Sequence, residues 1–169
     1  MSIRKDIINA VFNCISNNVP EVKFIDLWNE HIAEITTGAS WPMPAVFIEF
    51  EEIQWRQEGL NSRRADVGLR LHIITQAVNT SSGHNDANMQ SALEYFDLID
   101  CITASLQGLH GDNFSPLMLS HSATNHNHAE LIESIERFVF NARDNSAKSP
   151  VSSTSVKNLS IKNNKKARP

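Results

Sequence analysis

Hydrophobic positions recur with two different periods along the chain, and these periods separate helical from extended segments. Near the N-terminus they follow helical spacing behind Ser2, a residue type that suits an N-cap. The apolar residues of this stretch are Ile3, Ile7, Ile8, Val11, Phe12 and Ile15. The pattern predicts a first helix that ends near Asn17 and Asn18, before Pro20. The short apolar stretch from Val22 to Trp28 predicts a strand.

The clearest strand pattern runs from Ala45 to Arg56, directly after Pro42 and Pro44. Val46, Ile48 and Phe50 share one face, but Ile53 and Trp55 then have the opposite parity. A one-residue slip near Glu51–Glu52, as in a β-bulge, would return them to the core side.

A second long strand is predicted over about 64–77, with alternating side chains on its two faces. The predicted core-facing residues are Val67, Leu69, Leu71 and Ile73, and the outward ones are Asp66, Arg70 and His72. The linker 57–62 is short enough for an antiparallel hairpin.

A long helix is predicted over about 87–107, after a polar loop from Thr80 to Asp86. Its predicted inward stripe is Met89, Leu93, Phe96, Ile99, Ile102 and Leu106, widened by Leu98 and Cys101. Two closing strands are predicted over 117–123 and within 128–141. The order of elements predicts an α+β fold: a mostly antiparallel sheet with a long β-hairpin and two main helices packed on one face.

Composition places the chain among folded proteins that do not span a membrane. It has 169 residues, of which 41% are hydrophobic, and no run approaches the ~18 apolar residues needed to cross a bilayer. The N-terminus lacks the features of a secretory signal. Cys14 and Cys101 lie in the two predicted helices, and we expect buried free thiols in a reducing compartment.

Charge is distributed unevenly. Six of the 15 basic residues and no acidic residue follow Asp144, so the preceding body has a net charge of about −10. Residues 145–169 are rich in Ser, Asn and Lys without sustained periodicity, and we expect them to be disordered in isolation. The predicted organisation is a folded domain over 1–144 and a basic polar extension over 145–169. That extension either serves as a solubilising end or contacts nucleic acid or an acidic neighbour.

No set of residues predicts a catalytic, cofactor or metal site, and we expect no enzymatic activity. His121, His126 and His128 lie close together, but a fourth ligand and the spacing of a structural zinc site are missing. Asp97 and Asp100 share one helix surface, which would suit acid–base chemistry only inside a cleft. The sequence has no phosphate-binding glycine loop and no nucleophile motif.

Charged residues are concentrated on the predicted hairpin. The candidate subunit-interface residues are Glu49, Glu51, Glu52, Trp55, Arg56, Arg63 and Arg64. One account is cross-strand pairing within a single sheet face. The other is an acidic strip that meets a basic strip on a neighbouring subunit. The tryptophans at the ends of predicted elements (Trp28, Trp41 and Trp55) fit either interface anchors or ordinary edge packing.

The layout of the 1–144 body resembles that of phage tail terminator (tail completion) proteins. The resemblance comprises the first helix, the short strand, a Pro-led strand, a long hairpin, a long helix and two closing strands. Its most suggestive part is the sequence Pro-Ala-Val-Phe-Ile-Glu-Phe at 44–50, together with Leu-Arg-Leu-His-Ile-Ile at 69–74.

This resemblance implies a non-enzymatic virion protein at the head–tail junction, assembled in the cytoplasm of a bacterial host. Its implied partners are its own copies in a hexameric ring, the tail-tube protein and the head–tail connector or neck, with nonspecific contact to DNA in the channel. Alternatives are another connector, neck or tail-tube component. A small intracellular metal- or ligand-binding protein using His121, His126 and His128 would belong to a different class.

Overall fold

The computed structural model describes residues 2–29, 41–78, 83–125 and 130–147. Its helices are α1 (Ile3–Asn18) and α3 (Met89–Leu106), with a short 3-10 turn η1 (Gly83–Asn85). Its strands are β1 (Phe24–Leu27), β2 (Ala45–Phe50), β3 (Arg56–Gly59), β4 (Ser62–Gln76), β5 (Met118–Asn125) and β6 (Leu131–Asp144). The predicted loop from Thr80 and the stretch around His126 and His128 lie partly outside these residues, and 148–169 lie wholly outside.

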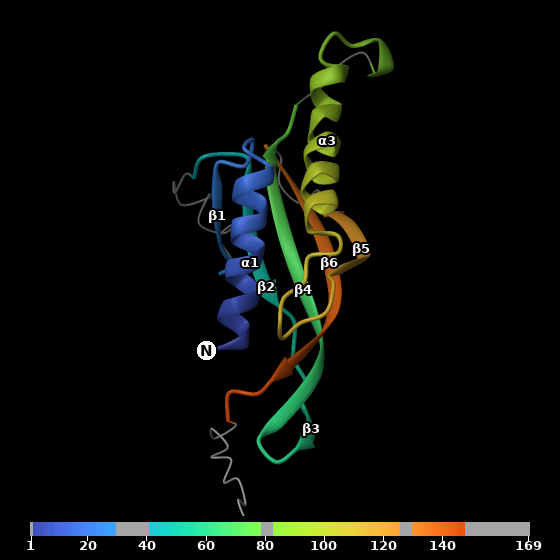
Figure 1. The fold of residues 1–169 in the computed structure, drawn as a ribbon. Coiled ribbons are helices and arrows are strands. Elements are labelled where there is room, and N and C mark those ends of the chain that lie inside the picture. The colour runs from blue at the N-terminus through green and yellow to red at the C-terminus, as the bar shows by residue number, and fades with distance from the viewer. Residues whose placement is uncertain (1, 30–40, 79–82, 126–129, 148–169) are drawn as a thin grey trace, which may run out of the picture.

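The described strands form one sheet in the order β1-β2-β4-β6-β5, with β3 added beside β4. β1 pairs with β2 in parallel, and the other pairs are antiparallel. The centre is the long β4–β6 ladder, which runs from Arg63 opposite Asp144 to Gln76 opposite Leu131. Both helices cover the same face of the sheet (Figure 1). The predicted α+β fold and its mostly antiparallel sheet are therefore confirmed.

The main core lies between the helices and this inner face of the sheet. α1 buries four side chains one turn apart: Ile3, Ile7, Val11 and Ile15. β4 buries the alternating set predicted from its sequence: Val67, Leu69, Leu71 and Ile73. Each such burial contributes about 1.5–3 kcal/mol. The predicted first helix and the face of β4 are confirmed.

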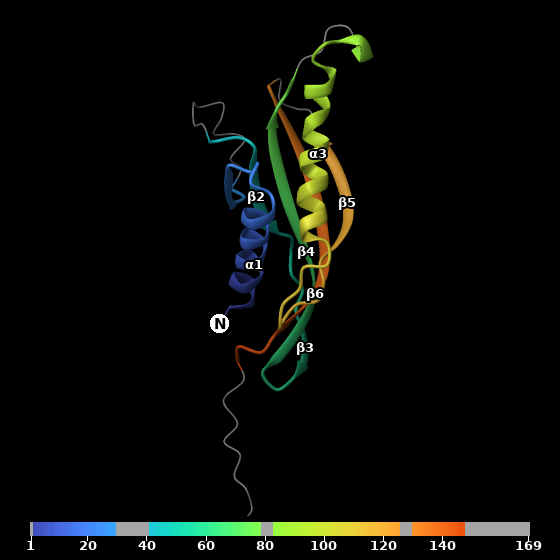
Figure 2. The ribbon, with the colours of Figure 1, turned by 45° about the horizontal axis from the view of Figure 1, so that its top comes forward.

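α3 packs on the sheet through the C-terminal part of the predicted stripe, and the predicted stripe is wrong at Leu93 and Phe96. Ile102 and Leu106 are fully buried, and Leu98 and Ile99 pack against the core. Leu93 and Phe96 are instead 44% and 47% exposed, so their predicted inward placement is wrong. The first turns of α3 reach past the end of β4 (Figures 1 and 2).

The strand predicted over Ala45–Arg56 is interrupted by more than a one-residue bulge. β2 ends at Phe50, and the chain resumes strand pairing as β3 at Arg56. Ile53 and Trp55 nevertheless pack against the main core, as predicted. β3 occupies the first half of the predicted linker. The turn contains Asn61 at φ 66°, a left-handed conformation that asparagine adopts more readily than most residues.

A second apolar cluster lies on the outer face, where Trp28 and Trp41 pack their rings against Phe47 of β2. Edge packing therefore accounts for these two tryptophans. Of the cysteines, Cys14 is half-buried and Cys101 is exposed, so the expectation of two buried thiols is wrong for Cys101. No helix in the described part of the chain has the length and apolar character needed to cross a membrane.

Candidate functional site

Ion pairs occupy the centre of the outer face. Glu51, just after β2, accepts hydrogen bonds from Arg70 of β4 and from Arg137 of β6, with N–O distances of 2.8 Å to both guanidinium groups. The hydrogen bonds and positive charge of Arg137, aided by Arg70, lower the pKa of Glu51. The carboxylate lies directly over Gly68, where an added Cβ would be 2.0 Å from Oε2. The absence of a side chain at Gly68 makes room for this network.

Beside the network, His72 is fixed between two carboxylates. Its Nδ1 lies 2.7 Å from Glu133 Oε1, and its Nε2 lies 3.3 Å from Glu49 Oε1. The ring stacks on the indole of Trp28 with centroids 3.8 Å apart. His72 faces outward as predicted, but it is only 5% exposed because neighbouring side chains cover it. Both ring nitrogens have carboxylate partners, so this histidine connects β2, β4 and β6.

The hairpin arm, residues 56–66, extends from the end of the sheet opposite the start of α3 (Figure 1). Two residues after the turn, Arg63 Nη2 lies 2.7 Å from Asp144 Oδ2 of β6. The same guanidinium stands 4.9 Å from the ring centroid of Trp55. Hydrogen bonds from Ser146, together with Arg63, lower the pKa of Asp144 to about 2.

Further contacts connect the arm to β6. Arg64 donates to Asn141, and Arg143 pairs with Glu58 at 2.6 Å. At the tip, Leu60 is 93% exposed. Asn141, Arg143 and Asp144 were not singled out from the sequence, because they become partners only through the register of β6.

The seven candidate interface residues divide into separate groups. Glu49 and Glu51 lie in the outer-face network, and Glu52 is exposed between β2 and β3. The others belong to the arm or its base: Trp55, Arg56, Arg63 and Arg64. Within one chain, the partners of Glu49, Glu51 and Arg63 match the cross-strand account. Their role between subunits stays a prediction.

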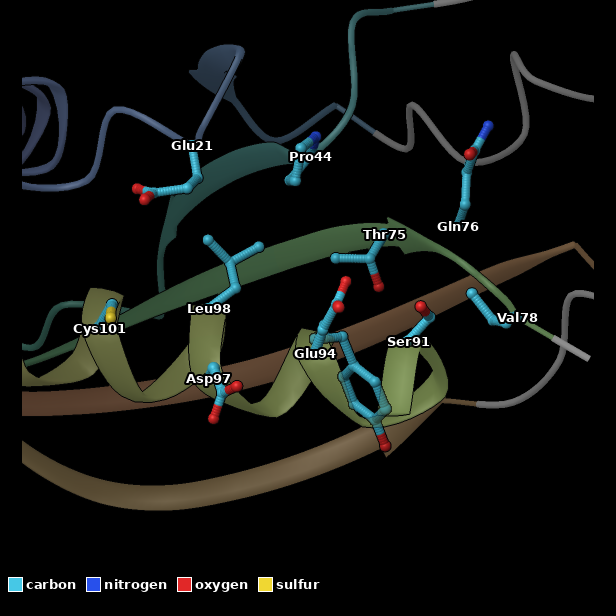
Figure 3. A pocket seen from close by; sticks show the side chains of 11 residues that line it. Glu21, Pro44, Thr75, Gln76, Val78, Ser91, Glu94, Asp97, Leu98 and Cys101 are labelled. Atoms are coloured by element: carbon cyan, nitrogen blue, oxygen red, sulfur yellow. The ribbon is translucent and has the colours of Figure 1, made fainter. Parts of the chain in front are cut away.

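A groove of about 400 Å³ lies between α3 and the end of β4 (Figure 3). Leu98 and Val78 give it apolar surface, and three carboxylates line it: Glu21, Glu94 and Asp97. None of the described lining residues is basic. Thr75 also lines the groove; it is 7% exposed, and its hydroxyl has no hydrogen-bond partner among the described residues. This groove was not predicted from the sequence, because Glu21, Thr75 and Glu94 come from three distant segments.

Another carboxylate is buried beneath α3. Glu136 of β6 is 3% exposed and accepts a hydrogen bond from the Ser122 hydroxyl of β5. Burial raises the pKa of Glu136, and the nearby negative charge of Asp100 adds to this effect. Asp97 therefore lines the groove while Asp100 acts on Glu136, and the two do not form a shared acid–base pair.

The described residues include no group of three His, Cys, Asp or Glu side chains arranged to hold a metal ion. His121 lies exposed on β5, and the other two histidines of the predicted cluster lie outside the described residues. Comparison with protein-family models and with curated protein sequences finds no match for this chain.

Proposed function

We propose that this chain is a structural component of a phage virion, a tail terminator that closes the tail tube and joins it to the head connector. Support comes from the order of elements: helix, short strand, Pro-led strand, hairpin, long helix and two closing strands. This order agrees with the family layout that the sequence resembles. The protein would act by binding other proteins and would catalyse no reaction.

The hairpin arm is the observation that carries this proposal. It is fixed to β6 by the ion pairs Arg63–Asp144 and Arg143–Glu58, and Leu60 in the turn is almost fully exposed. An arm that is already ordered loses little conformational freedom when a partner binds it. A ring protein needs such a preformed contact with a neighbouring subunit or with the tube.

The two edges of the sheet also suit a ring. A closed ring joins two different surfaces of each subunit rather than one self-complementary patch. One edge is the short parallel strand β1 with Leu27 exposed, and the other is β5 with Met118 and Leu119 exposed. The two edges differ from each other, and both carry exposed apolar side chains. This combination favours a head-to-tail contact between copies.

In this role the partners are other copies of the chain in a hexameric ring, the tail-tube protein and the head connector or neck. The site of action is the head–tail junction of the virion, after assembly in the bacterial cytoplasm. The strongly acidic body suits a ring through which DNA passes, because like charges limit adhesion to the phosphate backbone.

The test is made on particles. Tails assembled with and without the protein are imaged, and the tagged protein is located by gold labelling. We expect label at the head–tail junction, and overlong tails without heads when the protein is absent. Tails of normal length that join heads without it would disprove the terminator role.

A variant tests the arm directly. Leu60→Asp combined with Arg56→Glu changes two exposed residues of the arm, and we expect at least a tenfold loss of incorporation into particles with an unchanged thermal midpoint. Arg63→Glu is less suitable, because it would place a second negative charge beside Asp144. Leu93→Asp, an exposed site on α3, is the matched control, and normal incorporation is expected.

A further inference from the structure

The groove beside α3 has the features of a peptide-binding site. Glu21 and Glu94 come from opposite walls, and Leu98 provides apolar surface between them (Figure 3). Thr75 contributes a buried hydroxyl without a hydrogen-bond partner among the described residues. This hydroxyl is shielded from solvent, so the accessible features of the groove are its carboxylates and the apolar surface of Leu98.

The charge of the groove indicates a cationic ligand. Its lining includes three carboxylates and no basic side chain among the described residues. Carboxylates with a shared apolar surface favour lysine or arginine, because the aliphatic stem packs on the apolar part while the charged end reaches the carboxylates.

The chain itself contains a matching segment. Residues 148–169 hold six basic residues, no acidic ones and a few scattered apolar residues such as Val156, Leu159 and Ile161. Fully extended, this segment would span up to about 70 Å, which is enough to leave its own subunit and reach another.

The start of the segment and the groove lie at opposite ends of the subunit, and the segment is long enough to reach its own groove or that of another copy. β6 ends at Asp144, which pairs with Arg63, whereas Thr75 and Gln76 lie at the other end of the same ladder. The two positions are separated by about 40 Å of strand. Binding in the groove of another copy therefore connects copies head to tail, which is a heterologous contact.

We propose that the basic segment 157–168 of one copy binds in the acidic groove between α3 and β4 of a neighbouring copy. The lysines contact Glu21, Glu94 and Asp97. This contact concerns how copies associate, and it goes beyond any role at the head–tail junction.

Cys101 offers a direct test, because it is exposed and lines the groove. One full-length chain carries Ser160→Cys with Cys101→Ser, and a differently tagged chain keeps Cys101 and the natural Ser160. The two are mixed under mild oxidation and separated on a non-reducing gel. We expect a disulfide-linked product that contains both tags. This two-tag product should be lost when Cys101 of the second chain is also replaced by Ser, because that chain then keeps only the half-buried Cys14.

Charge variants of the second chain then test the groove. Glu94→Gln with Asp97→Asn should lower the initial cross-linking rate at least tenfold, and 0.5 M salt should act in the same direction. The matched control, Asp66→Asn with Asp112→Asn, removes two exposed carboxylates outside the groove and should leave the rate unchanged. Thermal midpoints check that each variant is folded.

Three results would overturn the proposal. One is the absence of the mixed-tag product. Another is equal cross-linking rates for the groove variant and its matched control. The third concerns a chain that carries Ser160→Cys and keeps its own Cys101. If this chain forms only intrachain disulfides, the segment lies in its own groove.

Discussion

Gly68 is the position where a single methyl group should reveal the outer-face ion network. An alanine Cβ there would lie 2.0 Å from Glu51 Oε2 and 2.7 Å from Glu51 Cδ, which is far inside contact distance. The carboxylate would have to move, and its hydrogen bonds to Arg70 and Arg137 would lengthen or break. The perturbation therefore acts on the ion network and leaves the strand pairing in place.

The expected loss follows from these contacts. Hydrogen bonds to charged groups contribute about 1.5–3 kcal/mol when shielded from solvent. Arg70 and Arg137 are 46% and 34% exposed, so solvent screening reduces each to below about 1 kcal/mol. Alanine also lowers the conformational entropy of the unfolded chain relative to glycine, and this offsets roughly 0.5–1 kcal/mol of the loss. We expect Gly68→Ala to lower the free energy of unfolding by about 1 kcal/mol, or about 2–4 °C in thermal midpoint.

The assay is chemical denaturation of Gly68→Ala in two backgrounds. With Glu51→Ala already present, no carboxylate lies over Gly68, so the same change should be neutral or slightly stabilising. Gly59→Ala is the control, because an added Cβ there meets no atom within 4 Å. An equal cost in both backgrounds would refute the steric argument, since the cost could not then come from the carboxylate.

Three further predictions concern other parts of the fold. Glu136→Gln should stabilise the protein at pH 7, because burial raises the pKa of Glu136; the gain should vanish below about pH 4.5, where the carboxyl is protonated in both states, as measured by denaturation across pH. The pKa of Asp144 is shifted in the opposite direction, to about 2. Ionised Asp144 therefore stabilises the fold above pH 3.8, its ordinary pKa, and this contribution is lost as the pH falls towards 2. Asp144→Asn should flatten the pH dependence in that window, and unchanged acid unfolding would contradict the pairing. Ile102→Ala should lower the free energy of unfolding by about 2–5 kcal/mol, and Phe96→Ala by less than about 1 kcal/mol. If thermal unfolding shows the larger loss for Phe96→Ala, then Phe96 faces the core, as the sequence pattern predicted.

The parts predicted correctly are those where one face is strongly hydrophobic over many residues. α1 buries its side chains at the predicted spacing, and β4 places Val67, Leu69, Leu71 and Ile73 in the core as its sequence indicates. In both elements, exposing the apolar face would cost several side-chain burials at once, so the local pattern determines the orientation.

The residues missed were those whose partners depend on strand register. Arg137, Glu133 and Asp144 all belong to β6, and each pairs with a group about 60 to 86 positions earlier in the chain. Periodicity predicts that β6 is a strand, but it does not fix which residue of β4 lies opposite. For this reason the charged residues of the hairpin could be predicted from the sequence, but their partners on β6 could not.

The error in α3 and the presence of the groove have the same physical origin. The mean direction of Leu93 and Phe96 differs from that of Ile102 and Leu106 by about 130° around the helix, so one rotation cannot bury both pairs. Rotating α3 to bury the first pair would expose the second, at a cost of about 1.5–3 kcal/mol for each side chain. The sheet lies under the C-terminal half of α3, so Ile102 and Leu106 fix the rotation and turn Glu94 towards Thr75. Weakening that burial should therefore alter binding in the groove as well as stability.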